Sequence, residues 1–283
     1  MKKKVEKDIS ILIPSKIVDN NLIYCIKQIR KFYKKIKIIL VLDNPSQYKL
    51  GKNIQIVISG NETIGFKRNL GLKHISTEFV SFIDSDAYPK SHWLDKCLKF
   101  FKNKKIAAVG GPNLSPKTND IEKILVARSR KNSIVTLNPK VKSIKTKKQF
   151  INFLPSCNMI VRSSVYKKIN GMDPRLYSSE EISLNYKINK KGFKMFFSPE
   201  IFVYHSDRNF KHFARQRFIY GSTGLWYSIR YPCKESFMLL ASSFPTVFVL
   251  CFPIIFISHA LKLTFLLGSL LLVLSIIMNS IKI

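Results

Sequence analysis

Acidic side chains and cysteines are scarce in this sequence. Only 17 of the 283 residues are Asp or Glu, against 48 Lys and Arg, which gives a formal net charge of +31. The five cysteines are an odd number without a C-x-x-C pair, which argues against a disulfide framework and favours reduced thiols. Zinc-finger spacing, an RNP-like aromatic motif and a basic region leading into heptads are also absent, so the sequence disfavours nucleic acid as a partner.

The excess of positive charge is spread over the first 236 residues and indicates a partner of opposite charge. An anionic membrane surface and a phosphorylated substrate both fit, and a lysine-rich solvated surface without a specific partner fits as well. The hydrophobic fraction of 46% is sufficient for a buried core. Neither an apolar signal region nor a cleavage site follows the first lysines, so we expect no signal peptide.

Short apolar runs alternate with segments of helical spacing through most of the chain. Strands are expected at residues 9–14, 36–42, 54–58, 79–83, 106–109 and 157–161, and helices at 20–34, 65–74, 91–101, 163–169, 178–191 and 210–220. Such alternation predicts βαβ units, hence an α/β fold with a mostly parallel sheet and helices on both faces. Residues 115–150 are polar and poorly periodic, which predicts a loop-rich insertion.

From residue 236 the composition becomes almost continuously apolar. Residues 237–258 carry no charge and are long enough to cross a bilayer core of about 30 Å, whereas residues 263–278 are nearly as apolar but shorter. We therefore expect C-terminal transmembrane helices, one or two, in a membrane segment at residues 236–283 that follows a domain of residues 1–235. The positive-inside tendency predicts that this domain lies on the cytoplasmic face of the membrane.

Two carboxylates follow the strand expected at residues 79–83. Asp84 and Asp86 flank Ser85, and ligands of open α/β sheets bind outside the carboxyl ends of the strands. Acids at such a position supply oxygen ligands for Mg²⁺ or Mn²⁺, and Mg²⁺ is commonly held by carboxylates together with substrate phosphates. The alternative is ordinary turn chemistry, in which Asp84 caps a helix that begins near Pro89.

Further motifs follow one another in order along the chain. They are the strand that ends at Pro14, the acidic turn at Asp43, the G-F-K-R-N-L-G-L segment with Arg68 and Asn69, the Gly110-Gly111-Pro112 turn, the G-M-D and S-E-E-I-S-L stretches around Glu180 and Glu181, and the pair Tyr204-His205. Together with Asp84-Ser85-Asp86, this series resembles the family 2 glycosyltransferases of the inverting GT-A type over roughly residues 9–225.

The resemblance implies a GT-A fold, the Rossmann-like fold of nucleotide-diphospho-sugar transferases. It also implies transfer of a sugar from a nucleoside diphosphate-sugar donor, with inversion and with the help of a divalent metal, Mg²⁺ or Mn²⁺. The donor contacts implied by the motifs are Pro14, Asp43, Arg68, Asn69, Asp84 and Ser85. The metal ligands would be Asp86 and Asp84, with His205 as a third ligand or, alternatively, as a structural hydrogen-bonding residue.

The catalytic base of the family is usually Asp, whereas the aligned residue here is Glu181, with Glu180 as a rival. Such a base takes the proton of the acceptor hydroxyl as it attacks the anomeric carbon opposite the leaving group. The alternative is a first-turn glutamate that the helix dipole favours. The Q-x-x-R-W motif of processive members is only echoed around residues 215–218, without the Trp, which disfavours processive polymer synthesis.

Arg215 and Arg217 lie on a basic stretch shortly before the apolar segment. We expect them to contact the phosphates of the donor or, alternatively, anionic lipid headgroups. A basic domain beside a membrane anchor fits a membrane lipid or lipid-linked glycan as acceptor. Two other classes stay open: a nucleotidyltransferase, although a glycine-rich basic loop after the first strand is missing, and a catalytically inactive GT-A-like membrane scaffold, although its acids are present.

Overall fold

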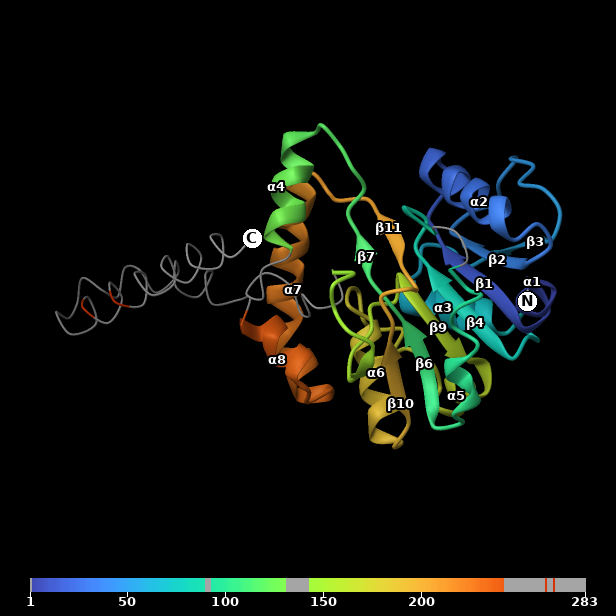
Figure 1. The fold of residues 1–283 in the computed structure, drawn as a ribbon. Helices are drawn as coiled ribbons and strands as arrows, with labels where there is room; N and C mark the ends of the chain where they lie inside the picture. The colour runs from blue at the N-terminus through green and yellow to red at the C-terminus, as the bar shows by residue number, and fades with distance from the viewer. Residues whose placement is uncertain (1, 90–92, 131–142, 242–262, 264–266, 268–283) are drawn as a thin grey trace. The chain divides into compact units, whose positions relative to one another are not determined.

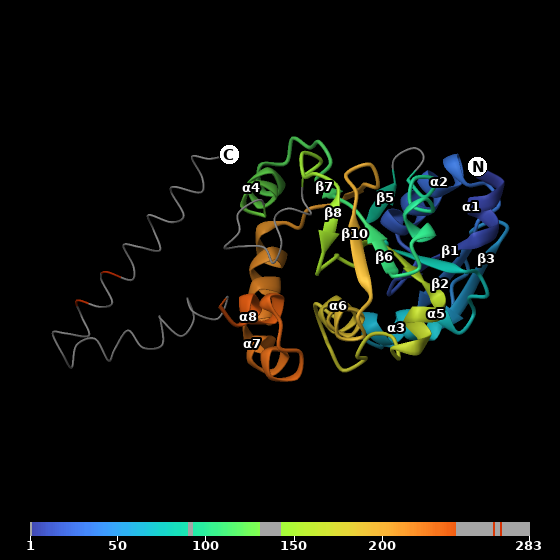
Figure 2. The ribbon, with the colours of Figure 1, turned by 60° about the horizontal axis from the view of Figure 1, so that its bottom comes forward.

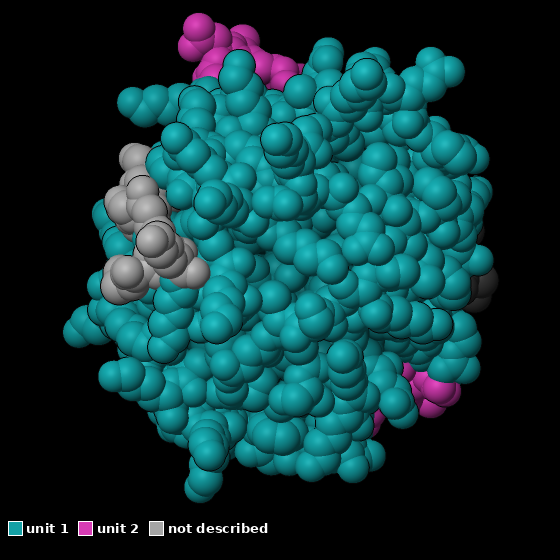
Figure 3. All heavy atoms as spheres, turned by 90° about the vertical axis from the view of Figure 1, so that its right-hand side faces the viewer, with its two compact units in different colours: residues 1–117, 140–207 teal, residues 118–139, 208–283 magenta. Residues whose placement is uncertain are grey.

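The computed structural model describes residues 2–89, 93–130, 143–241, 263 and 267. The chain divides into two compact units, coloured teal and magenta in Figure 3. Residues 1–117 and 140–207 form unit 1, and residues 118–139 and 208–283 form unit 2. The expected division into a domain of residues 1–235 and a membrane segment stays a prediction.

Unit 1 is built on a sheet of eight strands (Figure 1). The order across the sheet is β3 (Ile54–Ile58), β2 (Lys37–Leu42), β1 (Ile9–Pro14), β4 (Phe79–Ile83), β9 (Asn158–Arg162), β6 (Ile106–Gly110), β10 (Lys194–Phe197) and β8 (Gln149–Ile151). The first four strands are mutually parallel, as are β6 and β10. β9 runs antiparallel to both β4 and β6, and β8 is antiparallel to β10. The predicted α/β fold with a mostly parallel sheet is therefore confirmed, with two reversed strands.

Both faces of the sheet are buried at its central strands, which explains why these strands are mostly apolar in sequence. In β1, Ile11 and Ile13 pack on one face and Leu12 on the other. The first face is covered by α2 (Asn20–Phe32), by α1 (Lys2–Asp8) and by residues 93–102, which end in the short 3₁₀ helix η1 (Phe100–Lys102). The other face is covered by α3 (Ile64–Leu72), α5 (Ser163–Lys168) and α6 (Glu181–Lys190), as Figure 2 shows from a second side.

Helix α3 lies unusually close to the sheet. A Cβ atom on Gly71 would stand 2.7 Å from Leu12 Cδ1 and 2.9 Å from Val41 Cγ2, so only glycine allows this approach. At the other end of the helix, the Thr63 side chain accepts a hydrogen bond from Phe66 N at 3.2 Å and donates one to Pro174 O at 2.6 Å. The helix is thus fixed between the sheet and the loop that precedes α6.

A small second sheet forms beside the end of β4. It contains β5 (Ala87–Pro89), β11 (Val203–His205) and β7 (Asn113–Leu114), with β11 in the middle. The helix expected at residues 91–101 is wrong over its described part, where turns and η1 stand instead. The helix-capping interpretation of Asp84 is also wrong, because a turn and then β5 follow it.

Unit 2 contains three described helices, α4 (Ile121–Ser129), α7 (Phe210–Arg230) and α8 (Lys234–Ala241). Helix α7 continues ten residues beyond the end expected from the sequence. No helix in the described part of the chain has both the length and the apolar character that crossing a membrane requires. Residues 242–262, which make up most of the first predicted membrane span, lie outside the described residues, as does nearly all of the second.

Candidate functional site

The site forms at the edge of the sheet where the parallel strands end. Because β1, β2 and β4 are parallel, Ser15, Asp43 and Asp84 follow their strands at the same edge. Strand β9 runs the opposite way, with Asn158 paired to Ile83, so the residues just before β9 arrive at this edge as well. Pro14, the last residue of β1, also lies here, paired with β2.

Lys67 of α3 holds two of these strand ends together. Its side chain is fully buried, and Nζ donates a hydrogen bond to Ser15 O at 2.8 Å and forms an ion pair with Asp43 Oδ1. Lys67 is therefore not exposed to solvent. Lys67 is instead an internal counterion for the acidic turn after β2. The role of Asp43 in recognising the nucleotide base stays a prediction.

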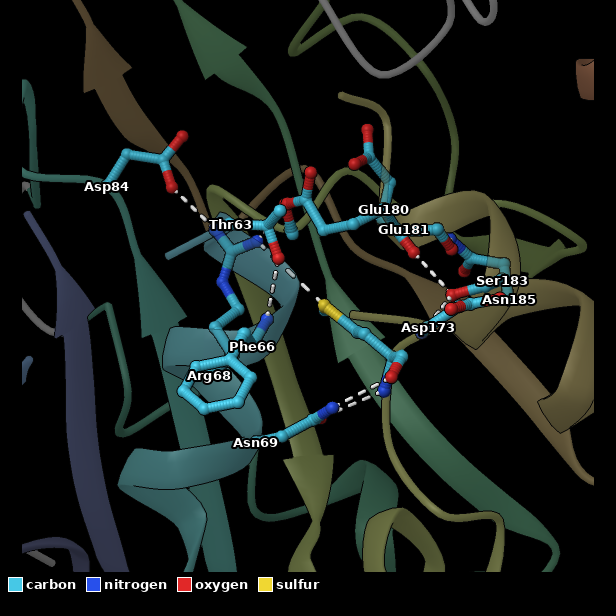
Figure 4. A network of polar contacts seen from close by, with 12 residues as sticks. Thr63, Phe66, Arg68, Asn69, Asp84, Asp173, Glu180, Glu181, Ser183 and Asn185 are labelled. Carbon is cyan, nitrogen blue, oxygen red and sulfur yellow. Dashed lines mark hydrogen bonds and ion pairs between the residues drawn. The ribbon is translucent and has the colours of Figure 1, made fainter. Parts of the chain in front are cut away.

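Arg68 is the centre of the site (Figure 4). It is completely buried and forms ion pairs with Glu180 Oε1 and, at 2.7 Å, with Asp84 Oδ1. Its guanidinium carbon lies 5.6 Å from the centre of the Phe82 ring. Burial alone lowers the pKa of this guanidinium, but the carboxylates of Glu180 and Asp84 more than offset that effect and raise it. A permanent positive charge therefore joins the acid after β4 to the start of α6.

Asn69 serves the loop before α6. Its Oδ1 accepts hydrogen bonds from Tyr166 Oη at 2.8 Å and Met172 N at 3.0 Å, and its Nδ2 donates to Met172 O at 2.8 Å. A Cβ on Gly171, which has a φ of +54°, would stand 2.1 Å from Asn69 Oδ1. These contacts use the amide to fix the loop, so the predicted donor contact of Asn69 stays untested beside a clear structural role.

The two glutamates at the start of α6 have different environments. Glu180 is buried, and its Oε1 also accepts a hydrogen bond from Ser156 Oγ at 3.4 Å. Figure 4 shows the Glu180 side chain extending toward Arg68 and that of Glu181 diverging from it. Glu181 is partly exposed, yet desolvation by the surrounding protein and then the charge of Glu180 raise its carboxyl pKa to about 8. The two carboxylates therefore differ: that of Glu180 is held by Arg68, whereas that of Glu181 is partly exposed and has a raised pKa.

The start of α6 has no side-chain cap. The N-cap residue is Glu180, without a side-chain capping bond, and Ser179 before it has a positive φ of 53°. Ser183 fixes the backbone at the start of the helix, because its Oγ donates to Glu180 O at 2.7 Å and accepts from Asp173 N at 2.9 Å. A serine in the first turn of α6 thus fixes the backbone that carries both glutamates, a role for which the sequence has no local signal.

The structure brings His205 and the two acids after β4 together, and their role as metal ligands stays a prediction. His205 Nε2 lies 3.5 Å from Asp84 Oδ2 and 3.4 Å from Asp86 Oδ1, while Nδ1 lies 3.0 Å from Ser206 O. Cys157, which the sequence analysis did not select, adds its sulfur: ligand atoms of Asp84, Cys157 and His205 all lie within 4.8 Å of one another. Only the register of β9 against β4 could have revealed this neighbour.

Three further predicted residues are Ser85, Arg215 and Arg217. Ser85 lies in the turn between β4 and β5 and is partly exposed. Arg215 is exposed on α7, whereas the Arg217 guanidinium lies 4.3 Å from the Tyr220 ring centre, and burial lowers the pKa of Arg217. Both arginines belong to unit 2, so their contact with donor phosphates or lipid headgroups stays a prediction.

Replacing Arg68 by Met should destabilise the fold strongly. The substitution keeps the apolar stem but leaves Glu180 and Asp84 without their counterion, and breaking a buried ion pair costs about 3–5 kcal/mol. Urea unfolding of the full chain measures this. The control is Lys99→Met, since Lys99 is 52% exposed beside Glu200 and should lose less than about 1 kcal/mol. Equal losses in the two variants would contradict the central role of Arg68.

Comparison with known proteins places these features in a wider group. A family model described as Glycosyl transferase family 2 matches residues 10–169. Pre-mycofactocin glycosyltransferase of Mycobacterium tuberculosis is 23% identical over 62% of this chain, which spans only 37% of that protein. Glycosyltransferase AglE of Haloferax volcanii is 23% identical over 75% of this chain and 71% of its own length.

Solved structures share the fold at low identity. The mannosyltransferase PcManGT of Pyrobaculum calidifontis, solved with GDP-Man and Mn²⁺, has a TM-score of 0.61 at 11% identity, over 93% of this chain and 80% of its own. GalNAc-T7, solved with UDP, GalNAc and Mn²⁺, has a TM-score of 0.54 at 14% identity, over 71% and 44%. They confirm the GT-A-like α/β fold. Because the family model covers more than half of the sequence, the chain belongs to glycosyl transferase family 2.

Proposed function

We propose that the chain transfers a sugar from a nucleoside diphosphate-sugar to an acceptor hydroxyl, with inversion at the anomeric carbon. The observation that carries the proposal is the meeting of Asp84, Asp86 and His205 at the strand ends, with Glu181 directly after Glu180, which Arg68 joins to Asp84. Leaving-group stabilisation and proton removal are the two tasks that such a transfer requires. The chain offers a separate set of side chains for each task.

A divalent cation fits the first set. The imidazole Nε2 of His205 lies 3.5 Å from a carboxylate oxygen of Asp84 and 3.4 Å from one of Asp86. Such ligands suit Mn²⁺ or Mg²⁺. When bound, the cation would neutralise the charge that develops on the diphosphate leaving group. The two solved structures that share the fold were both determined with Mn²⁺ and nucleotide, which supports this assignment.

Glu181 is the better candidate for the base. The Glu180 carboxylate is held by Arg68 and Ser156 inside the protein, so using it as a base would disrupt a buried ion pair. Glu181 remains partly exposed, and its raised pKa of about 8 brings it near the pH at which a general base is most effective. It would receive the acceptor proton during attack on the face opposite the diphosphate.

Donor turnover by the detergent-solubilised chain tests the assignment. Across a panel of nucleotide-sugars we expect one donor to be used, with Mn²⁺ or Mg²⁺ required and EDTA abolishing turnover. Asp86→Ala should remove metal-dependent turnover, and Glu181→Gln should lower kcat by about 10²–10⁴ with donor binding kept. Glu62→Gln, at an exposed glutamate outside the site, is the matched control. Failure of every donor to bind would favour the inactive scaffold, and release of diphosphate from a nucleoside triphosphate would favour a nucleotidyltransferase.

The rate of transfer should depend on pH through Glu181. Its pKa is raised from 4.5 to about 8, so the carboxyl is protonated, and unable to accept a proton, below that pH. Activity should therefore rise as the pH passes about 8, and the profile of kcat/KM in the free enzyme measures this. A rate that is independent of pH between about 5 and 9 would remove Glu181 from the mechanism.

A membrane lipid or lipid-linked glycan is the acceptor class we propose, with the domain acting at the cytoplasmic face of the membrane. Phe218, Leu225 and Ile229 of α7 are 66%, 59% and 75% exposed, and their spacing places them on one side of the helix. Arg215 adds exposed positive charge to the same helix. An apolar face with basic neighbours is typical of helices that lie in a membrane interface, which supports this acceptor class together with the apolar segment 236–283.

Transfer to a phosphorylated lipid acceptor in vesicles should exceed transfer to a soluble analogue. The double substitution Phe218→Ser/Ile229→Ser removes exposed apolar area and should lower vesicle-dependent transfer several-fold, with donor hydrolysis unchanged. Phe150→Ser, at a 57% exposed aromatic residue of β8, controls for the loss of a surface aromatic. Full activity on the soluble analogue, with no loss when the lipid phosphate is removed, would refute the membrane acceptor.

A further inference from the structure

Cys157 brings a soft ligand to a site that otherwise offers oxygen and nitrogen. Its sulfur, a carboxylate oxygen of Asp84 and a ring nitrogen of His205 lie within 4.8 Å of one another. Zinc sites with three protein ligands keep a fourth position for water or substrate, with bonds of about 2.0–2.3 Å. Such bonds require ligand atoms roughly 3.3–3.8 Å apart, so side-chain movements of about 1 Å would complete the site.

The topology of the sheet creates this cluster. Ile83 at the end of β4 pairs with Asn158 at the start of β9, so the residue after one strand faces the residue before the other. His205 arrives from a third segment, since β11 pairs it with Ala87, three residues after Asp84. Three backbone segments of unit 1, each fixed by strand pairing, therefore converge on one point.

The hydrogen bonds around the cluster orient two of the ligands for metal. A carbonyl oxygen only accepts, so the 3.0 Å contact with Ser206 O places the proton of a neutral His205 on Nδ1 and leaves the Nε2 lone pair toward the acids. Asn113 Nδ2 donates to the Cys157 sulfur at 3.0 Å. Both are contacts of the kind that support imidazole and thiolate ligands from the second shell of a metal site.

Asp84 and His205 are thus shared by two sets of ligands. Asp86 completes a hard set, in which His205 Nε2 lies 3.4 Å from its carboxylate, whereas Cys157 completes a soft set. Thiolate selects cations such as Zn²⁺ and Cd²⁺, and carboxylate suits Mg²⁺ and Mn²⁺. We propose that Asp84, Cys157 and His205 bind a thiophilic divalent cation at a position overlapping the donor-metal site, so that such a cation and Mn²⁺ exclude each other.

This site shares residues with the proposed function but does not depend on it, because metal binding is measured without any donor. Titration of the full chain with Cd²⁺ should produce one cadmium–thiolate ultraviolet band per chain, which Cys157→Ser and His205→Ala abolish. Asp86→Asn should retain it. Cys25→Ser is the matched control: Cys25 is also buried, and its sulfur lies 3.9 Å from Asp84 O, yet it is outside the cluster. The Kd for Zn²⁺ should rise at least about tenfold in Cys157→Ser.

Zinc-edge X-ray absorption of the wild-type protein gives a readout that needs no variant to fold. One sulfur neighbour at about 2.3 Å, together with nitrogen and oxygen neighbours, supports the proposal. Only nitrogen and oxygen neighbours, a cadmium band that persists in Cys157→Ser, or a band that requires Asp86 would each overturn it, and Cys157 would then be a buried packing residue. Donor turnover with Mn²⁺ can succeed or fail independently of all these outcomes.

Discussion

The structure depends on one buried positive charge. Arg68 is shielded from solvent, and a charge in that position is tolerated only when it is paired, which here requires both Asp84 and Glu180. Asp84 ends a central strand, whereas Glu180 stands before α6, so the ion pairs join segments about a hundred residues apart. The proposed metal side and the proposed base side of the site are consequently joined by one set of ion pairs. If either side moved away, the buried charge of Arg68 would lose one of its two partners.

The helix that carries Arg68 organises the rest of unit 1. Lys67, the residue before Arg68, binds the ends of β1 and β2 through Ser15 O and Asp43. Asn69, the residue after it, binds the loop at Met172. Gly71 brings the helix close enough to the sheet for these short-range contacts. Residues of a motif that implies nucleotide binding therefore have a structural role, in which they hold strand ends and a loop in place. Their predicted contacts with a donor stay predictions.

Much of this fold could be predicted because its central strands are buried on both faces and show as apolar runs, as in β2 and β6. The direction of β9 could not be predicted, since the orientation of a strand has no local sequence signal. For the same reason the sequence does not reveal that Cys157, just before β9, lies beside Asp84. The helix expected at residues 91–101 failed for another reason: Trp93 packs in the core from a turn and Phe101 from η1, so the helical spacing of apolar residues does not indicate an α-helix here. The burial of Lys67 contradicts the usual behaviour of lysine, and only the paired Asp43 explains it.

The two carboxylate oxygens of Asp84 have different partners. One carboxylate oxygen, Oδ1, is bound to Arg68, and the other, Oδ2, faces His205, so Asp84 can offer a cation only one oxygen without giving up its ion pair. A cation held by Asp84 and His205 would therefore take its third protein ligand from Asp86 or Cys157, the two side chains that flank this edge. The chemical character of that third side chain, hard oxygen or soft sulfur, would decide which cation is held. In this proposal, metal preference follows from the demand that the buried Arg68 places on Asp84.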